Sequence, residues 1–332
     1  MSGAERRTPA ELGAWVVDEA RRIGFDDVAL VRADRGTPRA AEVQDLAAAG
    51  LLDALPWLRE SVPDRTDLAG AYPGARTVIV VLQRYFTGDH HDHASEAELR
   101  DGAKVSRYAW GGDYHGGMRK RLRKLRKRLL QQVSPAPQVW IFNDQDAVLE
   151  RAWAEASGLG FVGKSGLLIS RIHGTWTFLG GLITDLDLGA PAPLPPHDLC
   201  GSCTRCLVAC PTGALVSPGQ LDVARCLTTW NIEHTEGGED LLAGRGWAAG
   251  CDVCQEVCPW NRFAEPTSEP RYQPRQGHVV LRPGTMPADL DGTPLARPGP
   301  EGLARAVTLA LQGEATEATP TDEGTDRSTR AR

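Results

Sequence analysis

The chain has 332 residues, of which 41% are hydrophobic and 24% are charged, so it can bury the core of one large domain and a small one. Its formal net charge of −6 argues against a general polyanion binder, and any basic surface has to be local. No apolar run reaches the length of a membrane span. The charged first residues are followed by no apolar segment, so we expect a cytoplasmic protein without a targeting segment.

The first elements of the chain are two helices with a strand between them. Thr8 and Glu11 have the spacing of a capping box, and Gly24 is placed to end the helix that this box begins. A short strand is predicted over residues 27–31, and a second helix over about residues 40–50. The chain therefore begins as a mixed α and β domain.

A strand buried on both faces is predicted over residues 77–82, which are apolar and mostly β-branched. Tyr85 follows the end of this strand, and the end of a central strand is a common position for side chains of a binding or active site. His90, His91 and His93 follow in a polar stretch. Three close histidines can bind a metal ion, but we favour a solvated loop.

Residues 119–128 form a strongly basic segment with eight cations in ten residues and no acid. Apolar residues occur at helical spacing through it, which predicts an amphipathic helix with a cationic outer face: Met118, Leu122, Leu125 and Leu129. A solvated surface helix is the ordinary meaning of such a run. In an acidic protein, however, this density of cations favours a polyphosphate partner such as a nucleic acid.

A further strand over residues 138–142 leads into Asp144, and a helix is predicted over about residues 147–157. From the residues alone, Asp144 is more readily explained as the cap of that helix than as a site acid. The glycine-rich turn over residues 158–166 is not a phosphate-binding Walker loop, because its first glycine has the wrong offset. Another strand begins at Thr175.

The proline-rich stretch before the cysteines indicates a domain boundary. Beyond about residue 313 the chain has almost no large apolar residue, so we expect disorder there. The predicted organisation is an α/β domain over 1–190, a linker over 191–196, a small cysteine-rich domain over 197–265 and an irregular segment over 266–332.

All eight cysteines lie between residues 200 and 258. The first four have the C-x2-C-x2-C-x3-C-P spacing of bacterial iron–sulfur proteins, in which the fourth cysteine of the run ligates the other cluster. Eight cysteines suit two [4Fe–4S] clusters with none left over. We assign cluster one to Cys200, Cys203, Cys206 and Cys258, and cluster two to Cys210, Cys226, Cys251 and Cys254.

Other roles for these cysteines are less favoured. Disulfides would need an oxidising compartment. Structural zinc uses two cysteines per knuckle, which leaves the third cysteine and the following cysteine–proline pair unexplained. Isolated buried thiols would not gather in so short a stretch.

Four stretches of the chain resemble the epoxyqueuosine reductases, a family that acts in queuosine modification of tRNA. They are residues 106–115, residues 144–169, residues 200–215 and residues 250–261. The resemblance implies reduction of epoxyqueuosine to queuosine at the tRNA wobble position, with cobalamin as a cofactor. It also implies a cobalamin-binding α/β domain like that of reductive dehalogenases, followed by a bacterial-type two-cluster ferredoxin domain.

The resemblance further implies roles for individual residues. Asp144 matches the proposed proton donor of the family, and positions that line the cofactor and substrate site match Tyr85, Arg151 and Lys164. His115 lies in a sequence close to the cobalt-ligand pattern of other cobalamin enzymes, but the required glycine is replaced by Met118, so we do not read it as a ligand. The expected partners are tRNA, at residues 119–128, and an external low-potential electron donor. We expect a monomer.

Three other functions are consistent with parts of the sequence. A cytoplasmic reductive dehalogenase would share the cofactors, but it would not need the basic helix. A plain electron-transfer protein would not need 190 residues ahead of its clusters. An iron–sulfur nucleic-acid-binding module without catalysis would explain the basic helix and leave the clusters structural.

Overall fold

The computed structural model describes residues 7–88, 101–287 and 289–312. The three histidines between residues 90 and 93 and the predicted disordered tail lie outside these described residues. Within the described part, no helix is both long enough and apolar enough to cross a membrane.

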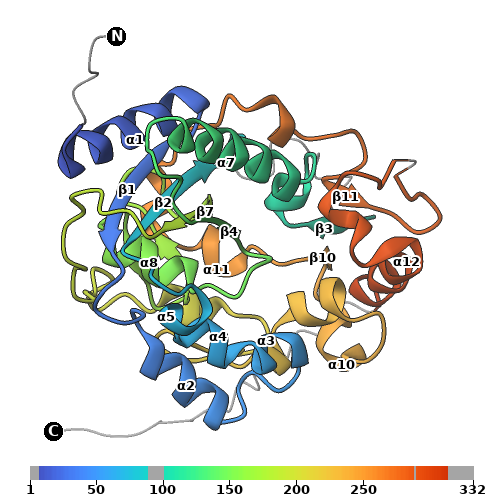
Figure 1. Ribbon diagram of the computed structural model, residues 1–332. Helices are drawn as coiled ribbons and strands as arrows, with labels where there is room; N and C mark the ends of the chain where they lie inside the picture. The colour runs from blue at the N-terminus through green and yellow to red at the C-terminus, as the bar shows by residue number, and fades with distance from the viewer. Residues whose placement is uncertain (1–6, 89–100, 288, 313–332) are drawn as a thin grey trace, which may run out of the picture.

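A four-stranded antiparallel sheet forms the centre of the larger domain (Figure 1). Its strands, in spatial order, are β1 (Asp27–Arg32), β2 (Thr77–Arg84), β7 (Thr177–Thr184) and β4 (Val139–Asn143). Strand β2 is buried along nearly its whole length, as predicted. Because every pairing is antiparallel, the domain is the α+β form of the predicted class rather than a parallel sheet.

Helices cover both faces of this sheet, which explains why β2 has no polar face (Figure 1). One face packs against α1 (Pro9–Ile23) and α7 (Tyr114–Leu130). Helix α1 has the predicted capping box, and Gly24 ends it with a φ of 108°. The other face packs against α8 (Glu150–Ala156) and α5 (Leu68–Ala71).

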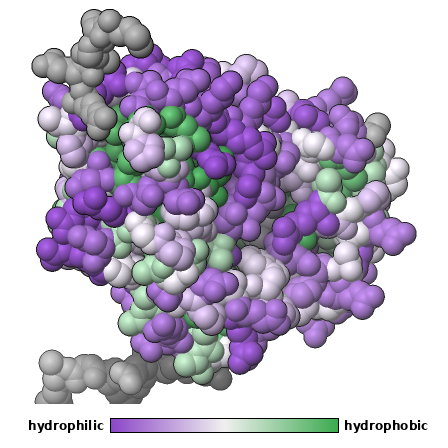
Figure 2. Space-filling model, viewed as in Figure 1, coloured by the Kyte–Doolittle hydropathy of each residue, from purple (hydrophilic) through white to green (hydrophobic). Residues whose placement is uncertain are grey.

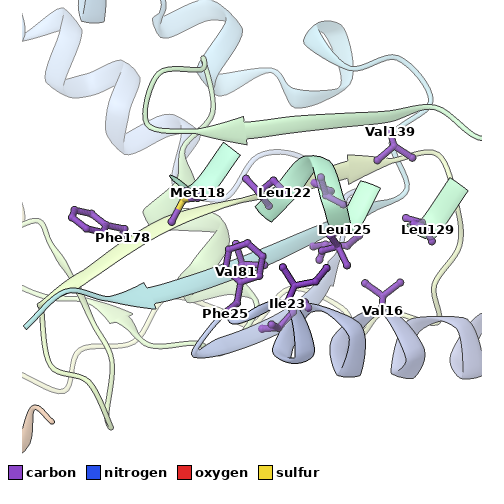
Figure 3. Packing of buried hydrophobic residues seen from close by; sticks show 14 of the residues in the cluster. Val16, Ile23, Phe25, Val81, Met118, Leu122, Leu125, Leu129, Val139 and Phe178 are labelled. Carbon is purple, nitrogen blue, oxygen red and sulfur yellow. The ribbon is translucent and has the colours of Figure 1, made fainter. Parts of the chain in front are cut away.

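The apolar side of α7 is part of the main core (Figure 3). Met118, Leu122, Leu125 and Leu129 are all 0% exposed, as the helical spacing predicted. They pack with residues of α1 and β2, such as Val16 and Val81. Burying one such side chain contributes about 1.5–3 kcal/mol. This packing fixes the start of α7 near the end of β4.

The remaining elements of the larger domain are short. Before β2 there are three further helices, α2 (Ala40–Ala48), α3 (Pro56–Glu60) and α4 (Val62–Thr66). A 3-10 turn, η1 (Arg107–Ala109), precedes α7. The glycine-rich turn contains the hairpin of β5 (Phe161–Val162) and β6 (Leu168–Ile169). Residues 187–200 have no regular secondary structure.

The cysteine-rich segment is built from short elements. These are α9 (Arg205–Ala209), β8 (Leu215–Ser217), β9 (Gln220–Leu221), η2 (Val223–Arg225), η3 (Thr229–Glu233), α10 (Glu239–Leu242), β10 (Trp247–Ala249), α11 (Val253–Glu256) and η4 (Pro259–Phe263). Such a segment has little core of its own, so it depends on what it packs against.

A second sheet joins the cysteine-rich segment to the rest of the chain. Strand β3 (Ala103–Val105) lies between β10 and β11 (Val280–Leu281). It pairs parallel with β10 and antiparallel with β11. Each strand of this sheet comes from a different segment of the predicted organisation.

Residues 266–312 are more regular than we predicted. Besides β11, they contain η5 (Pro270–Tyr272), η6 (Pro294–Ala296) and α12 (Gly299–Ala310). Helix α12 buries Leu303 and Val307, and it lies against β10 (Figure 1). The frequent proline and glycine suggested irregular chain, but Pro300 stands in the first turn, where it is tolerated, and an apolar helical stripe follows.

Candidate active site and cluster-binding segment

Asp144 lies in the loop between β4 and α8 and does not cap the helix that follows. Helix α8 begins at Glu150, its N-cap is Leu149, and no side chain caps it. The explanation of Asp144 as a helix cap is therefore wrong. Its carboxylate is 37% exposed and faces the N-terminus of α7.

Two side chains from the first turn of α7 hold the Asp144 carboxylate. The Tyr114 hydroxyl donates a hydrogen bond to its Oδ2. The His115 Nε2 lies 3.2 Å from its Oδ1. Asp113 caps α7 by accepting hydrogen bonds from the backbone N–H groups of His115 and Gly116, so the helix start and the site are built together.

His115 lies between two carboxylates and is poised as a cation. Its Nδ1 is 2.5 Å from Asp113 Oδ1, on the side opposite Asp144. Burial alone would lower the pKa of His115, but the hydrogen bonds with Asp113 and Asp144 outweigh it and raise the pKa to about 9. At neutral pH the imidazole therefore carries a proton on the nitrogen next to Asp144.

A column of aromatic rings runs from this site toward the cysteine-rich segment. The His115 ring stacks on Tyr114 with centroids 4.0 Å apart, and Tyr114 stacks on Phe178 at 3.9 Å. Phe178 in turn stacks on Tyr85 at 4.3 Å. The buried Tyr85 hydroxyl faces Gln255 Oε1 at 3.3 Å, next to Cys254. Burial raises the pKa of Tyr85 beyond its ordinary range, so it stays a neutral donor.

A buried polar network fastens the last cysteine loop to the larger domain. Thr175 Oγ1 donates to Gln255 Oε1 at 3.0 Å. Asn261 Nδ2 donates to Thr175 Oγ1 at 2.9 Å, and the Thr175 N–H donates to Asn261 Oδ1 at 2.7 Å. All three side chains are 9% exposed or less. Because loss of one partner would leave buried polar atoms unpaired, this network fixes the relative position of the two segments.

A second buried contact lies on the other side of the same loop. Asp252, between two cysteines, accepts hydrogen bonds from the Ser106 hydroxyl and from the Arg107 N–H, the latter at 2.7 Å. The Arg107 guanidinium lies over the rings of Trp110 and Trp176, 4.6 and 5.4 Å from their centroids. The stretch around residue 106 thus helps to seat the cysteine-rich segment.

The structure brings the four cysteines predicted for cluster one to a single cavity. All eight cysteines of the chain are free thiols. A cavity of about 120 Å³ is lined by Cys200, Cys203, Cys206 and Cys258, and Cys254, which we predicted for cluster two, lines it as well. Burial raises the pKa of the Cys258 thiol, and the nearby charges of the other three raise it further. The four predicted thiols at one cavity fit the ligation that a [4Fe–4S] cluster requires, and the presence of Cys254 in the lining shows that the two predicted groups adjoin.

The cysteines predicted for cluster two also lie together, deeper in the protein. Burial raises the pKa of Cys251, and the charges of Cys226 and Cys210 act on it too. Burial likewise raises the pKa of Cys254, with contributions from Cys251 and Cys226. The position of Cys254 beside Tyr85 and Gln255 places this group at the end of the aromatic column.

Arg151 and Lys164 bind backbone carbonyls of loops around the cysteine-rich segment. The Lys164 Nζ donates to Gly201 O and lines the cavity of cluster one. The Arg151 Nη1 donates to Gly166 O at 2.6 Å. Of the predicted site residues outside the cysteines, Tyr85 is thus linked to Asp144 by the aromatic column, whereas these two contact loops.

The cations of α7 divide into paired and exposed groups. Arg119 pairs with Asp146, Arg121 with Glu269 and Arg128 with Glu19. The other five are exposed and have no ion pair among the described residues: Lys120, Arg123, Lys124, Arg126 and Lys127. The surface over α7 is strongly hydrophilic in Figure 2. The three ion pairs were not predicted from the sequence, because the acidic partners lie far from α7 along the chain.

Tyr114 and His115 lie in the stretch 106–115 that resembles the family, but from the sequence neither was predicted to contact Asp144. Their roles depend on Asp144, which is 30 residues from Tyr114 in the chain. A signal was nevertheless present, since an aspartate directly before a tyrosine and a histidine marks a helix N-cap with two polar rings in the first turn. Gln255 was missed as well, because its partners come from the other domain.

The fold and the cysteine-rich segment together define an iron–sulfur oxidoreductase. Residues 199–261 match the family model of a 4Fe–4S double cluster binding domain, which covers all eight cysteines and decides between iron–sulfur ligation and zinc or disulfides. Residues 65–145 match the family model described as epoxyqueuosine reductase QueG, DUF1730.

Curated relatives agree with these matches. An epoxyqueuosine reductase from Synechococcus sp. is 39% identical over 83% of this chain and 84% of the relative. One from Synechocystis sp. is 41% identical over 72% of this chain and 81% of the relative. The chain belongs to the epoxyqueuosine reductase family.

Solved structures share the fold. An epoxyqueuosine reductase with an epoxyqueuosine-modified tRNA-Tyr stem loop has a TM-score of 0.80 at 24% identity, over 92% of this chain and 82% of that one. The enzyme from Bacillus subtilis, solved with its catalytic aspartate loop swung out of the active site, has a TM-score of 0.76. A catabolic reductive dehalogenase is also found, at a TM-score of 0.46 and 18% identity.

Proposed function

We propose that the protein reduces epoxyqueuosine in tRNA to queuosine, with cobalamin as a cofactor and two [4Fe–4S] clusters as the electron relay. The observation that carries the proposal is the Asp144 carboxylate, held by Tyr114 and His115 at one end of an aromatic column whose other end lies at Cys254. A proton source and an electron relay thus meet at one place, as a reduction with loss of oxygen requires.

The relatives support the choice of substrate. The curated relatives are named epoxyqueuosine reductases, and one solved relative was determined with an epoxyqueuosine-modified tRNA stem loop. The Bacillus subtilis relative has a catalytic loop that is named by an aspartate and is swung out of the active site in one solved structure. Asp144 also lies on a loop, between β4 and α8. We propose Asp144 as the corresponding acid of this chain.

The surroundings of Asp144 fit a large, flat and mostly apolar cofactor. Tyr108 and Tyr114 present aromatic surface beside it, with ring centroids 6.3 Å apart. The Asn143 Nδ2 next to Asp144 is buried and has no hydrogen-bond partner among the described residues. Bound cobalamin would supply a strong nucleophile toward an epoxide carbon. We propose Tyr85, Arg151 and Lys164 as residues that shape this cofactor site and the loops around it.

Asp144 delivers the proton needed at the epoxide oxygen, and His115 is the source of that proton. Removal of the oxygen as water consumes two electrons and two protons. The protonated His115 Nε2 lies 3.2 Å from Asp144 Oδ1. The proton that Asp144 passes to the departing oxygen is supplied by His115, while Tyr114 keeps the carboxylate in position. Solvent supplies the second proton.

The exposed cations of α7 are proposed to bind the tRNA backbone. Five of them lie on one helix without acidic partners among the described residues. Phosphate groups are the natural ligands of such a surface.

We also propose a role for each part of the chain. The α+β domain of residues 1–190 binds the cofactor and substrate, and residues 197–265 act as the ferredoxin-like unit. The protein is proposed to be a cytoplasmic monomer.

An Asp144→Asn variant tests the proposal. It should retain its iron and its cobalamin absorbance and lose nucleoside turnover by about 100-fold or more, in keeping with the loss of a general acid. Asp187→Asn is the matched control, since Asp187 is an exposed carboxylate paired with Arg76. Unchanged turnover in the Asp144 variant would eliminate Asp144 as the acid.

A further inference from the structure

Cluster one is placed close to an open hollow on the surface. Cys258 and Pro259 line the cavity of about 120 Å³ that holds the cluster-one cysteines. The same two residues, together with Arg205, line a second, open hollow of about 700 Å³, formed between α9 and the start of η4. The cavity of the cluster-one cysteines and the open hollow therefore share a wall.

The edge of the open hollow carries apolar side chains in solvent. Val208, on α9, lines the hollow and is 82% exposed. Phe263, at the end of η4, is 62% exposed, and the Arg262 guanidinium lies 4.4 Å from its ring centroid. A scattered exposed apolar residue needs no explanation. Here Val208 and Phe263 lie near the predicted cluster-one cysteines, and Arg262 stacks on the ring of Phe263.

The charge at the hollow is mainly positive. Arg205 and Arg262 line it, both are exposed, and neither has an ion pair among the described residues. Glu256 is the single acidic residue of the lining. Exposed arginines around an apolar centre are typical of a protein–protein interface.

We propose that this hollow is the docking surface for a small acidic electron-carrier protein that reduces cluster one. Each docking transfers one electron, so the reduced centre of the carrier is oxidised by one electron and the cluster is reduced by one. Two dockings supply the two electrons that loss of the epoxide oxygen consumes. The inference rests on the proposed function only in needing an external source of electrons.

A protein partner fits the hollow better than a nucleic acid does. The hollow exposes apolar side chains such as Val208, whereas phosphate backbones bind to densely charged surfaces. The five exposed cations of α7 already provide such a surface. An acidic carrier would meet the two arginines at the edge and bring its redox centre to the cysteine wall.

The test measures cluster reduction itself, without tRNA or cobalamin, so it does not depend on the substrate. Reduced plant-type [2Fe–2S] ferredoxin, an acidic carrier with a potential near about −400 mV, is mixed with the oxidised protein in a stopped-flow instrument. In Arg205→Glu/Arg262→Glu the rate of cluster bleaching should fall about tenfold or more, since edge charges act on association. Reduction by dithionite should stay unchanged.

A charge-matched control and a second variant separate an effect on docking from an effect on folding or cluster content. Arg35→Glu/Arg245→Glu carries the same change of charge on exposed residues of other elements, and it should behave as wild type. If the arginine variant loses iron, Val208→Asp at an 82% exposed position provides the same comparison. Equal ferredoxin rates in the variants and wild type would overturn the inference. So would a loss of tRNA binding with unchanged ferredoxin rates, which would make the hollow a nucleic-acid site.

Discussion

Replacing His115 by glutamine should remove a pH-dependent part of the stability of the protein. In the folded state the pKa of His115 is about 9, against 6.5 for an unperturbed histidine. Because the folded state holds the proton more tightly, the contribution is complete below about pH 6.5 and is lost as the pH rises through about 9. One pKa unit corresponds to about 1.4 kcal/mol, so the contribution is at most about 3 kcal/mol.

The assay is urea unfolding of wild type and His115→Gln under anaerobic conditions, with the clusters reconstituted. The difference in the free energy of unfolding between the two proteins should shrink by up to about 3 kcal/mol from about pH 6 to about pH 10. His197→Gln serves as control, because His197 has no ion pair among the described residues. A wild-type-to-variant difference that stays constant over this pH range would refute the account of His115 as a cation held by two carboxylates.

Two further predictions concern α7. Leu122→Ala should lower the free energy of unfolding by about 3 kcal/mol, because Leu122 is 0% exposed in the main core, whereas Lys124→Ala on the exposed side should change it by less than about 0.5 kcal/mol. In a filter-binding assay at several salt concentrations, Arg123→Glu/Lys127→Glu should weaken tRNA binding and lower the slope of log affinity against log salt by about 2. An unchanged slope would show that these cations do not contact phosphates.

Much of the fold could be predicted because local signals agree with the packing. The capping box at Thr8 and Glu11 and the glycine at residue 24 define α1 without reference to the rest of the chain. The apolar spacing from Met118 to Leu129 likewise gives the buried side of α7. The antiparallel order of the sheet was not predictable, since a strand buried on both faces is equally consistent with a parallel sheet.

That the cysteines bind two [4Fe–4S] clusters was predictable because ligand spacing is a local property of the chain. The site around Asp144 was not, because its geometry depends on contacts between residues far apart in sequence. Only the structure shows that Tyr114 and His115 hold this carboxylate and that α8 begins at Glu150 rather than directly after Asp144. The sequence could present Asp144 as a candidate only through the family resemblance.

The regular secondary structure after residue 265 could not be predicted from amino-acid composition. Its prolines and glycines fall mainly in turns and in the first turn of α12, where they are compatible with a helix. Leu303 and Val307 then pack near β3 and β10 in a core that residues from distant parts of the chain complete. Composition averages over these positions and therefore hides the helix.

Turnover of epoxyqueuosine-containing tRNA is the decisive experiment on this protein. The protein, reconstituted with iron, sulfide and cobalamin, is incubated anaerobically with epoxyqueuosine-containing tRNA and a low-potential reductant, and the nucleosides are then analysed. The account predicts that queuosine forms, and that none forms when cobalamin is left out. Absence of queuosine from protein that carries both clusters and cobalamin would contradict it.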